Sequence, residues 1–319
     1  MSEQGRKYAL DFRREETAYV MERWLASQSC ALVGIGSVGK SNLLRHLSSA
    51  QTQTHYLGNA LGSWFRAIII DPNMLGSLPV HDANNDSVRA WAGYELLMHR
   101  LFLAFYPFEQ LNKDEAQRFY EAYESLQDGS NPLYAYMSLR YFELALEYLF
   151  RRDARIVFMF DEFEELLRLM PVKFFQNLRG LRDSHKSQLA YLTFTRTPLN
   201  IASDQAGIPA AEIESFIELF TDSTYFVGPY NEADAARMVN DLVSRSGKAL
   251  SQDTVKTITA VTGGYAGLLR SAFSLIDPGV LLTPTDEHLN NAANYLAQRL
   301  PIRTECRTIW MSLTPSEQF

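Results

Sequence analysis

The sequence has few cysteines and few histidines. Its 319 residues include 2 cysteines and 6 histidines. The histidines lack the spacing of metal ligands, and neither Cys30 nor Cys306 lies in a catalytic string, which argues against a protein-built metal centre and a cysteine nucleophile. The two cysteines are far apart, and Cys30 precedes an apolar run where a small buried side chain fits. A reducing compartment is the simplest setting.

Long hydrophobic runs and an excess of positive charge are also missing. No stretch approaches the roughly 18 apolar residues of a membrane span, and the first residues, MSEQGRKYALDF, contain no apolar signal core. The net charge of -7 gives no general attraction to nucleic acid or to anionic membranes. We therefore expect a soluble, cytoplasmic protein that has no membrane partner.

Apolar residues are abundant, and their spacing predicts an α/β fold. Hydrophobic residues make up 46% of the chain, enough for one large or two modest domains. Short apolar runs alternate with stretches of helical spacing, which predicts a parallel sheet flanked by helices. The run from Ile156 to Phe160 is continuously apolar, as expected for a strand covered on both faces. The five expected strands are residues 30–35, 66–72, 155–162, 188–196 and 223–230.

After Pro229 the pattern is purely helical, so we place a domain boundary near Tyr230. Between Pro72 and Asp86 the content of glycine, proline and asparagine predicts a loop. The expected helices lie at 16–26, 41–50, near 87–106, 113–127 and 132–151, and then at 231–246, 251–263, 265–276 and 285–300. The predicted divisions are an N-terminal helix in 1–30, a core in 31–229 with a helical insertion at 113–151, a smaller all-helical lid in 230–300, and a linker or the start of a truncated domain in 301–319.

The stretch GIGSVGKS, residues 34–41, matches G-x-x-x-x-G-K-[ST] between an expected strand and an expected helix. Backbone N–H groups of such a loop wrap an anion where side chains are absent, and the helix N-terminus adds its positive dipole end. Lys40 would reach the outer phosphates of a triphosphate, and Ser41 would bind Mg²⁺. A glycine turn with a surface lysine is the less favoured alternative. The predicted nucleotide-binding residues are Gly34, Gly36, Ser37, Val38, Gly39, Lys40, Ser41 and Asn42.

A second motif, IVFMFDEFEELL, places two carboxylates at the end of the central strand. Asp161 would lie at the carboxyl edge of the sheet, where ligands bind in open α/β folds, and could hold the water shell of the Mg²⁺. Glu162 could orient or deprotonate the attacking water. Because Glu164 follows three residues after Asp161, a helix cap with its reciprocal carboxylate is an alternative interpretation.

Two arginines are candidates for contact with the phosphates. Arg196 ends the fourth expected strand, where a fixed guanidinium could bind a terminal phosphate. Arg270 follows the glycines of VTGGYAGLLR and could approach the phosphates when a lid closes. An exposed surface arginine is an equally good interpretation of both. Arg179 and Arg182 are candidates for a residue that acts across a subunit boundary.

In this order, GIGSVGKS, VFMFDEFEEL, YLTFTR and TGGYAGLLR resemble the motifs of the signal-transduction P-loop ATPases called STAND, within or beside the AAA+ group. The resemblance covers roughly residues 12–275. It implies a P-loop NTPase core with a helical lid, in which Arg196 senses the γ-phosphate. Two positions depart from it: Ala266 stands where a proline is frequent, and Arg13 stands where glycine is usual. The final stretch, TIWMSLTPSEQF, resembles the opening helix of a winged-helix domain.

These observations predict an ATP-binding, slowly hydrolysing regulatory ATPase that uses ATP or ADP with Mg²⁺ and forms a nucleotide-dependent homo-oligomer. A protein partner or effector domain is a further expectation. An AAA+ ATPase that assembles on nucleic acid is an alternative, which the interleaved carboxylates of LFRRDAR and LRGLRDSHK disfavour. A small-molecule kinase and a non-hydrolysing nucleotide-binding module also remain open.

Overall fold

The protein is described here by a computed structural model that covers residues 8–76, 85–128, 133–248, 250–276, 285–313 and 317–318. Two units can be distinguished. The sheet unit contains Ala18–Val33 and Leu44–Tyr225, and the helical unit contains Met1–Thr17, Gly34–Leu43 and Phe226–Phe319 within those described residues. This division does not test the boundary expected near Tyr230, which stays a prediction.

The sheet has five strands in the order β2-β3-β4-β1-β5. Parallel pairing joins β2 to β3, β3 to β4 and β4 to β1, so the predicted parallel sheet is confirmed. All five expected strands form, although β5 is shorter than expected. Their bounds are β1 Cys30–Val33, β2 Phe65–Ile70, β3 Arg155–Phe160, β4 Leu189–Thr195 and β5 Thr224–Phe226.

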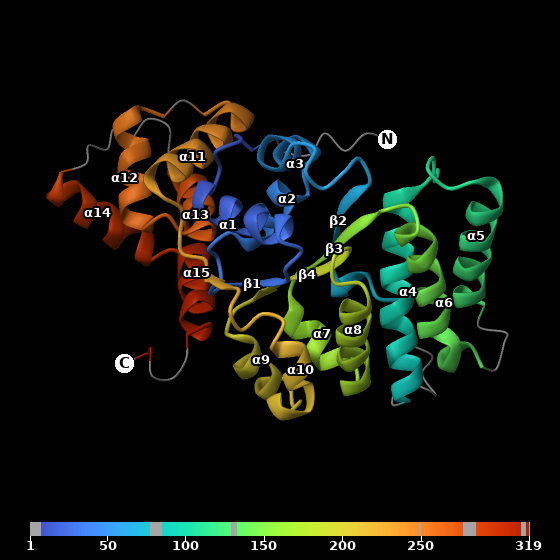
Figure 1. Cartoon of the computed structure of the whole chain (residues 1–319). Helices are drawn as coiled ribbons and strands as arrows, with labels where there is room; N and C mark the ends of the chain where they lie inside the picture. The colour runs from blue at the N-terminus through green and yellow to red at the C-terminus, as the bar shows by residue number, and fades with distance from the viewer. Residues whose placement is uncertain are drawn as a thin grey trace. The chain divides into compact units, whose positions relative to one another are not determined.

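The inner strands β3 and β4 show that the sheet is covered on both faces. Every residue of β4 is buried, and so is every residue of β3 after Arg155. Strands without an exposed face need helices on both sides of the sheet. Figure 1 shows α3 on one side of the sheet, and α7 and α8 on the other. The register pairs Phe160, the last residue of β3, with Thr193 of β4.

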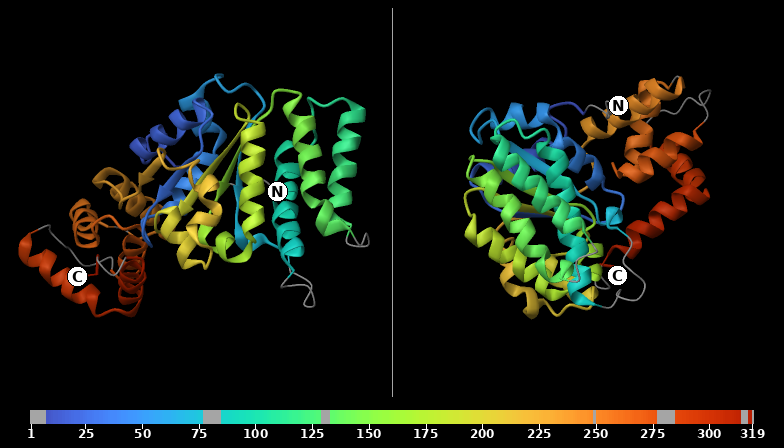
Figure 2. Two further views of the ribbon diagram at one scale, coloured as in Figure 1. Left: turned by 60° about the horizontal axis from the view of Figure 1, so that its bottom comes forward. Right: turned by 90° about the vertical axis from the view of Figure 1, so that its right-hand side faces the viewer.

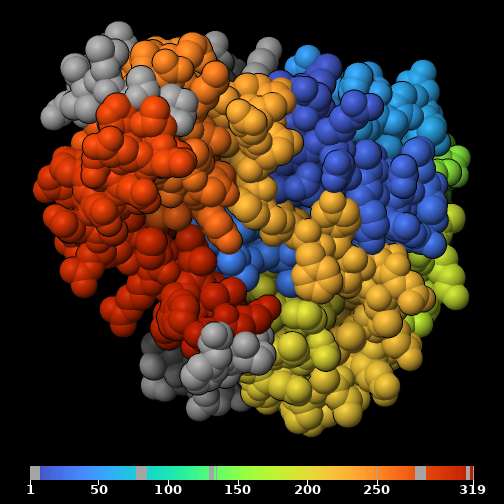
Figure 3. Space-filling view, turned by 90° about the vertical axis from the view of Figure 1, so that its left-hand side faces the viewer, coloured from blue at the N-terminus to red at the C-terminus, as the bar shows by residue number. Residues whose placement is uncertain are grey.

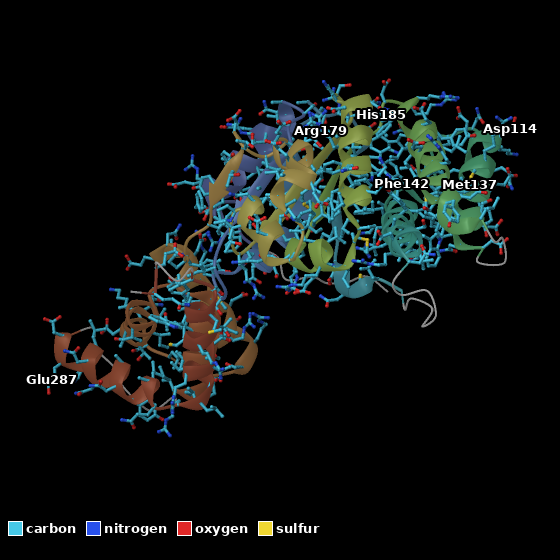
Figure 4. The ribbon with its side chains drawn as sticks, turned by 90° about the horizontal axis from the view of Figure 1, so that it is seen from below. Asp114, Met137, Phe142, Arg179, His185 and Glu287 are labelled. Carbon is cyan, nitrogen blue, oxygen red and sulfur yellow. The ribbon has the colours of Figure 1, made fainter. Side chains whose placement is uncertain are left out.

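Helices α4, α5 and α6 lie side by side in both Figure 1 and Figure 2. They correspond to the three helical segments expected between the second and third strands. Phe142 of α6, labelled in Figure 4, is fully buried and its ring lies 6.0 Å from that of Tyr94 in α4. The helices of this region are α4 Asp86–Phe105, α5 Lys113–Gln127, α6 Tyr134–Phe150, α7 Phe163–Leu169, α8 Val172–Ser184, α9 Leu199–Gln205 and α10 Glu214–Ile217, with the 3-10 turns η1 Pro72–Met74 and η2 Ala210–Ile213.

Near the N-terminus, α1 spans Arg14–Leu25, α2 spans Lys40–Ser48 and α3 spans Ala50–Leu57. The helix α3 was not expected from the sequence AQTQTHYL, because only Thr52 and Leu57 of it are buried and the apolar spacing is weak. The loop expected from Pro72 to Asp86 contains η1, and its residues 77–84 lie outside the described residues.

The helical unit has its own core, to which Met238, Ile258, Leu269 and Phe273 contribute. Asn231 and Ser251 cap the first two of its helices through side-chain oxygens, as their residue types predict. The helix expected to begin near Thr308 begins instead at Leu300, so residues 308–311 are its last turn. The bounds are α11 Glu232–Ser246, α12 Gln252–Thr262, α13 Ala266–Leu275, α14 Asp286–Ala297 and α15 Leu300–Met311.

Among the described residues, no helix combines the length and apolarity needed to cross a bilayer.

Candidate functional site

The glycine-rich loop connects the end of β1 to the beginning of α2, which is the context that its motif requires. Two of its residues have left-handed backbone conformations, with φ of +65° at Ser37 and +95° at Gly39. A Cβ atom on Gly34 would lie 2.8 Å from the carbonyl oxygen of Val227, so a larger residue does not fit. The glycines therefore allow both the turn and the close approach of neighbouring backbone.

Lys40 is the first residue of α2, and its ammonium group reaches back over the loop. It donates hydrogen bonds to the carbonyl oxygens of Gly34 and of Ile35, the latter over 3.2 Å. This places a cation beside the loop at the N-terminus of a helix, where an anion is also favoured by the helix dipole. Ser41, the next residue, is exposed. The roles of Lys40 in phosphate binding and of Ser41 in Mg²⁺ binding stay predictions.

Arg13 supports the loop from the N-terminal segment of the same unit. Its side chain is 1% exposed, and its guanidinium donates to the carbonyl oxygens of Val38, over 2.6 Å, and Gly228, over 2.8 Å. It also forms an ion pair with Glu16 and lies 4.6 Å from the ring centroid of Tyr230. Its φ of +46° is a backbone conformation that favours glycine.

Asn42 fixes the first turn of α2. Its side-chain oxygen accepts a hydrogen bond from the Tyr8 hydroxyl over 2.9 Å, and its side-chain nitrogen donates to the Tyr230 hydroxyl over 2.6 Å. Both polar groups of this buried amide are therefore engaged by protein. The sequence predicts Asn42 as a nucleotide contact. That role stays a prediction. The side chain of Asn42 connects the loop to two tyrosines, a contact that sequence reasoning missed because Tyr230 is 188 residues away.

Two helices of the helical unit also contact the loop. The backbone N–H of Gly267, in α13, donates to the carbonyl oxygen of Ser37 over 3.2 Å. The Ser37 hydroxyl donates to the carboxylate of Glu305 in α15. In addition, the backbone N–H of Gly36 donates to the hydroxyl of Ser312 over 3.1 Å. Neither Glu305 nor Ser312 was a sequence candidate.

The acidic pair follows β3 directly. Asp161 is partly exposed, and its carboxylate accepts a hydrogen bond from the backbone N–H of Glu162 over 3.0 Å. The N-cap of α7 is Glu162, with no side-chain cap, and the Glu164 carboxylate accepts from the backbone N–H of Arg196. The alternative reciprocal cap between Asp161 and Glu164 is therefore not formed.

Val33, before the glycine-rich loop, and Phe160, before Asp161, end strands of one parallel sheet, so both motifs begin at its carboxyl edge.

Glu162 has an unusual backbone and a neighbour that the sequence analysis missed. Its φ and ψ are +42° and 49°, a left-handed conformation that costs a non-glycine residue roughly 1–2 kcal/mol. Its carboxylate accepts a hydrogen bond from the side chain of Asn73 over 3.4 Å. Asn73 lies just after β2, the strand beside β3, and it also binds the carboxylate of Asp71. Its position after a strand of this sheet was the one signal that could have identified it.

The candidate arginines differ in their surroundings. Arg196 and Arg270 are both exposed. Arg179 forms an ion pair with Asp183 over 2.7 Å, and Arg182 donates to the carbonyl oxygen of Ser27 over 2.6 Å. The latter two are therefore engaged within their own chain, and the roles of all four arginines stay predictions.

Two further observations concern metal-ligating side chains and the buried cysteine. Within the described ranges, no group of three or more His, Cys, Asp or Glu side chains is placed to hold a metal ion. Cys30 is buried in β1, and burial raises the pKa of its thiol to about 12. A thiol in that state is a small apolar side chain rather than a nucleophile.

Comparison with solved structures gives the class of fold. The ORC2 protein of Aeropyrum pernix, in a structure of its ADPNP-ADP complexes, matches with a TM-score of 0.55 and 10% identity over 92% of this chain and 70% of that chain. The ORC1 protein of A. pernix in complex with DNA has a TM-score of 0.48 and 13% identity over 89% of this chain and 65% of that chain. No protein-family model matches the sequence, and a comparison with curated proteins finds no match. The five-stranded parallel sheet, its flanking helices and the helical C-terminal region are thus a fold that this chain shares with the ORC2 protein of A. pernix.

Proposed function

We propose that this chain is an ATP-binding, slowly hydrolysing regulatory ATPase of the STAND kind, in which the bound nucleotide controls the helical region and self-association. The observation that carries the proposal is that the glycine-rich motif and the acidic motif each follow a strand of the same parallel sheet. The loop with Lys40 and Ser41 follows β1, while Asp161 and Glu162 follow β3. A phosphate-binding loop and an acidic strand end at the same edge are the parts that phosphoryl transfer needs.

Each group has a distinct role in this proposal. Backbone N–H groups of residues 36–40 and the Lys40 ammonium bind the phosphates, because they offer donors and positive charge to an anion. Ser41 and Asp161 hold Mg²⁺ directly or through water. Glu162 orients the attacking water and accepts its proton. The likeness in fold to A. pernix ORC2, a protein seen in ADPNP-ADP complexes, supports a nucleotide as the ligand.

The local charge pattern favours this proposal over assembly on nucleic acid. In LFRRDAR, Arg151 pairs with Glu147 over 3.7 Å and Arg152 with Glu115 over 2.9 Å. In LRGLRDSHK, Arg179 and Lys186 both pair with Asp183, the one carboxylate between them. Cations neutralised in this way release few counterions from a phosphate backbone. Retention of duplex DNA that weakens steeply with salt would contradict this preference.

Nucleotide binding and turnover provide the direct test. Lys40→Ala should weaken ATP binding by about tenfold or more, because a counter-charge of the phosphates is removed. Glu162→Gln should leave the Kd for ATP nearly unchanged and lower kcat by about a hundredfold or more, as expected for loss of a general base. Lys173→Ala is the matched control, since Lys173 is an exposed lysine on α8. Unchanged ATP affinity in Lys40→Ala would contradict the loop assignment.

Two further measurements separate the remaining alternatives. Release of inorganic phosphate without a phosphorylated small acceptor distinguishes an ATPase from a kinase, and binding without any release indicates a non-hydrolysing module. The molecular mass in solution, compared between ADP and a slowly hydrolysed ATP analogue, tests the proposed nucleotide-dependent self-association. An equal mass in both states would contradict that part of the proposal.

A further inference from the structure

Helix α15 lies against the phosphate-binding loop within the helical unit. The backbone N–H of Gly36 donates to the hydroxyl of Ser312, the residue that ends α15, over 3.1 Å. A Cβ atom on Gly36 would meet that hydroxyl oxygen and the methyl carbon of Thr308, each at 2.9 Å. Gly36 is buried as a result. Thr308 and Ser312 therefore fill the space beside Gly36.

The groups that α15 presents are acceptors of the kind that a phosphate would present. The carboxylate of Glu305 accepts a hydrogen bond from the Ser37 hydroxyl, and the Ser312 oxygen accepts from the Gly36 N–H. The Ser312 hydroxyl can act as an acceptor here because its own proton is donated to the carbonyl oxygen of Thr308 over 2.7 Å. Anion-binding loops use the same N–H and hydroxyl donors for phosphate oxygens. The anionic side chain of Glu305 therefore occupies one donor of the loop, and the neutral hydroxyl of Ser312 occupies a second.

Gly267, in the glycine motif at the beginning of α13, lies beside both Glu305 and Ser37. A Cβ atom on Gly267 would lie 2.3 Å from the Glu305 carboxylate and 2.8 Å from the Ser37 hydroxyl. The backbone N–H of Gly267 binds the carbonyl oxygen of Ser37. Glycine at this position thus leaves room for the carboxylate of Glu305 beside Ser37. The predicted lid motif contributes to the contact between α15 and the loop.

The attachment of α15 is slight enough for it to be displaced. Ile302 is its one buried residue, and it packs into the core of the helical unit. Leu300, Trp310 and Met311 are 75%, 51% and 68% exposed. The red atoms of α14 and α15 form part of the molecular surface in Figure 3. Elements with few buried apolar contacts open at low cost in free energy.

We propose that α15 is an internal competitor of the nucleotide, with Glu305 as the anionic group that its phosphates displace. This inference rests on the proposed function of the loop as a nucleotide site. Some molecules have α15 on the loop and cannot bind the nucleotide. The apparent Kd is then the intrinsic Kd divided by the fraction of molecules in which α15 has left the loop. By the same linkage, bound nucleotide shifts α15 away from the loop.

The test compares ATP affinity in the full chain. Glu305→Ala should lower the Kd for MgATP about three- to tenfold, and Glu305→Gln, which keeps the shape without the charge, should have a smaller effect in the same direction. Glu287→Ala is the matched control, because Glu287 is an exposed carboxylate near the beginning of α14, as Figure 4 shows. Its Kd should equal that of the unmodified chain. Adding Lys40→Ala to Glu305→Ala should abolish the gain.

Hydrogen exchange gives a second readout that does not depend on the substitutions. MgATP should accelerate amide exchange in residues 300–312 of the unmodified chain and leave it unchanged in Lys40→Ala. If the unmodified chain binds ATP but Glu305→Ala binds it equally or more weakly, the competition is overturned while the proposed function stands. If neither chain binds nucleotide, the proposed function fails and this inference fails with it.

Discussion

The hydroxyl of Tyr230 accepts a hydrogen bond from the side-chain nitrogen of Asn42 over 2.6 Å. The same oxygen lies 2.6 Å from the position that a Cβ atom on Gly39 would take. One tyrosine therefore both secures the first turn of α2 and touches the glycine before Lys40. Residues separated by about 190 positions in the chain thus determine the shape of the glycine-rich loop together.

Gly39→Ala should destabilise the chain strongly, because the substitution adds a clash with Tyr230 to an unfavourable φ of +95°. We expect a loss of about 3 kcal/mol or more in the free energy of unfolding, measured by urea denaturation. Gly58→Ala is the control, since Gly58 also has a positive φ, +53°, but no atom within 4 Å of a Cβ. It should lose about 1 kcal/mol.

A double substitution separates the effect of the clash with Tyr230 from the effect of the unfavourable φ at position 39. Tyr230→Phe removes the hydroxyl, and by itself should lose about 1 kcal/mol with the hydrogen bond to Asn42. In the Gly39→Ala background the same change should cost less, or even stabilise, because the clash is relieved. Additive losses of the two substitutions would show that the hydroxyl is not what excludes a side chain at Gly39.

Arg13 combines an unfavourable backbone conformation with a buried guanidinium. Arg13→Ala should lose about 2–5 kcal/mol in the free energy of unfolding, because the carbonyl oxygens of Val38 and Gly228 lose their donors and Glu16 loses its partner. Arg13→Gly should be about 1 kcal/mol more stable than Arg13→Ala, since φ is +46°. The exposed neighbour supplies the control, and Arg14→Ala should change stability by less than about 0.5 kcal/mol. Equal stability of the alanine and glycine variants would refute the strain at position 13.

The sequence predicts the features that depend on local pattern. Residues 34–41 predict a phosphate-binding loop because its glycines, lysine and serine fall within eight residues, between a strand and a helix. The apolar run before Asp161 likewise predicts a buried strand that ends in a carboxylate. Both expectations rest on spacing within about 15 residues. The parallel sheet follows from the alternation of such runs with helices, and the structure confirms it.

Features that depend on tertiary contact were missed. Glu305 lies 268 positions from Ser37, and Ser312 lies 276 positions from Gly36, so no local spacing connects them. The placement of Asn73 beside Glu162 depends on the pairing of β2 with β3, which the sequence does not specify. The helix α3 was missed for a different reason, because a helix that buries little apolar surface shows little periodicity.

Asn73 should affect turnover rather than stability. Its side chain donates to the carboxylate of Glu162, so it restricts where that carboxylate points. Given the proposed role of Glu162, Asn73→Ala should lower kcat about three- to tenfold and leave the Kd for ATP within about twofold. The free energy of unfolding should change by less than about 0.5 kcal/mol, as for other exposed positions. Asn200→Ala, at an exposed asparagine of α9, is the control. A change in Kd with kcat intact would exclude a positioning role for Asn73.

The buried carboxyl of Asp234 should make stability depend on pH. Burial raises the pKa of Asp234 above its ordinary value of 3.8, while the Arg13 backbone N–H and the charge of Arg237 oppose the increase. A carboxyl whose pKa is higher in the folded chain than in the unfolded chain binds its proton more tightly when folded. Its contribution to stability is therefore greatest below the unfolded pKa and declines as pH rises through the folded pKa.

Asp234→Asn removes this titration and keeps an oxygen that can accept from the Arg13 N–H, which Asp234 now does over 3.0 Å. The free energy of unfolding, measured by urea denaturation between pH 3.5 and 7.5, should therefore increasingly favour the variant over the unmodified chain as pH rises. Asp253→Asn, at an exposed carboxylate of α12, gives the background effect of removing one negative charge. A difference that instead grows in favour of the unmodified chain with rising pH would mean that Arg237 outweighs burial, and that Asp234 is held as a carboxylate beside Arg13.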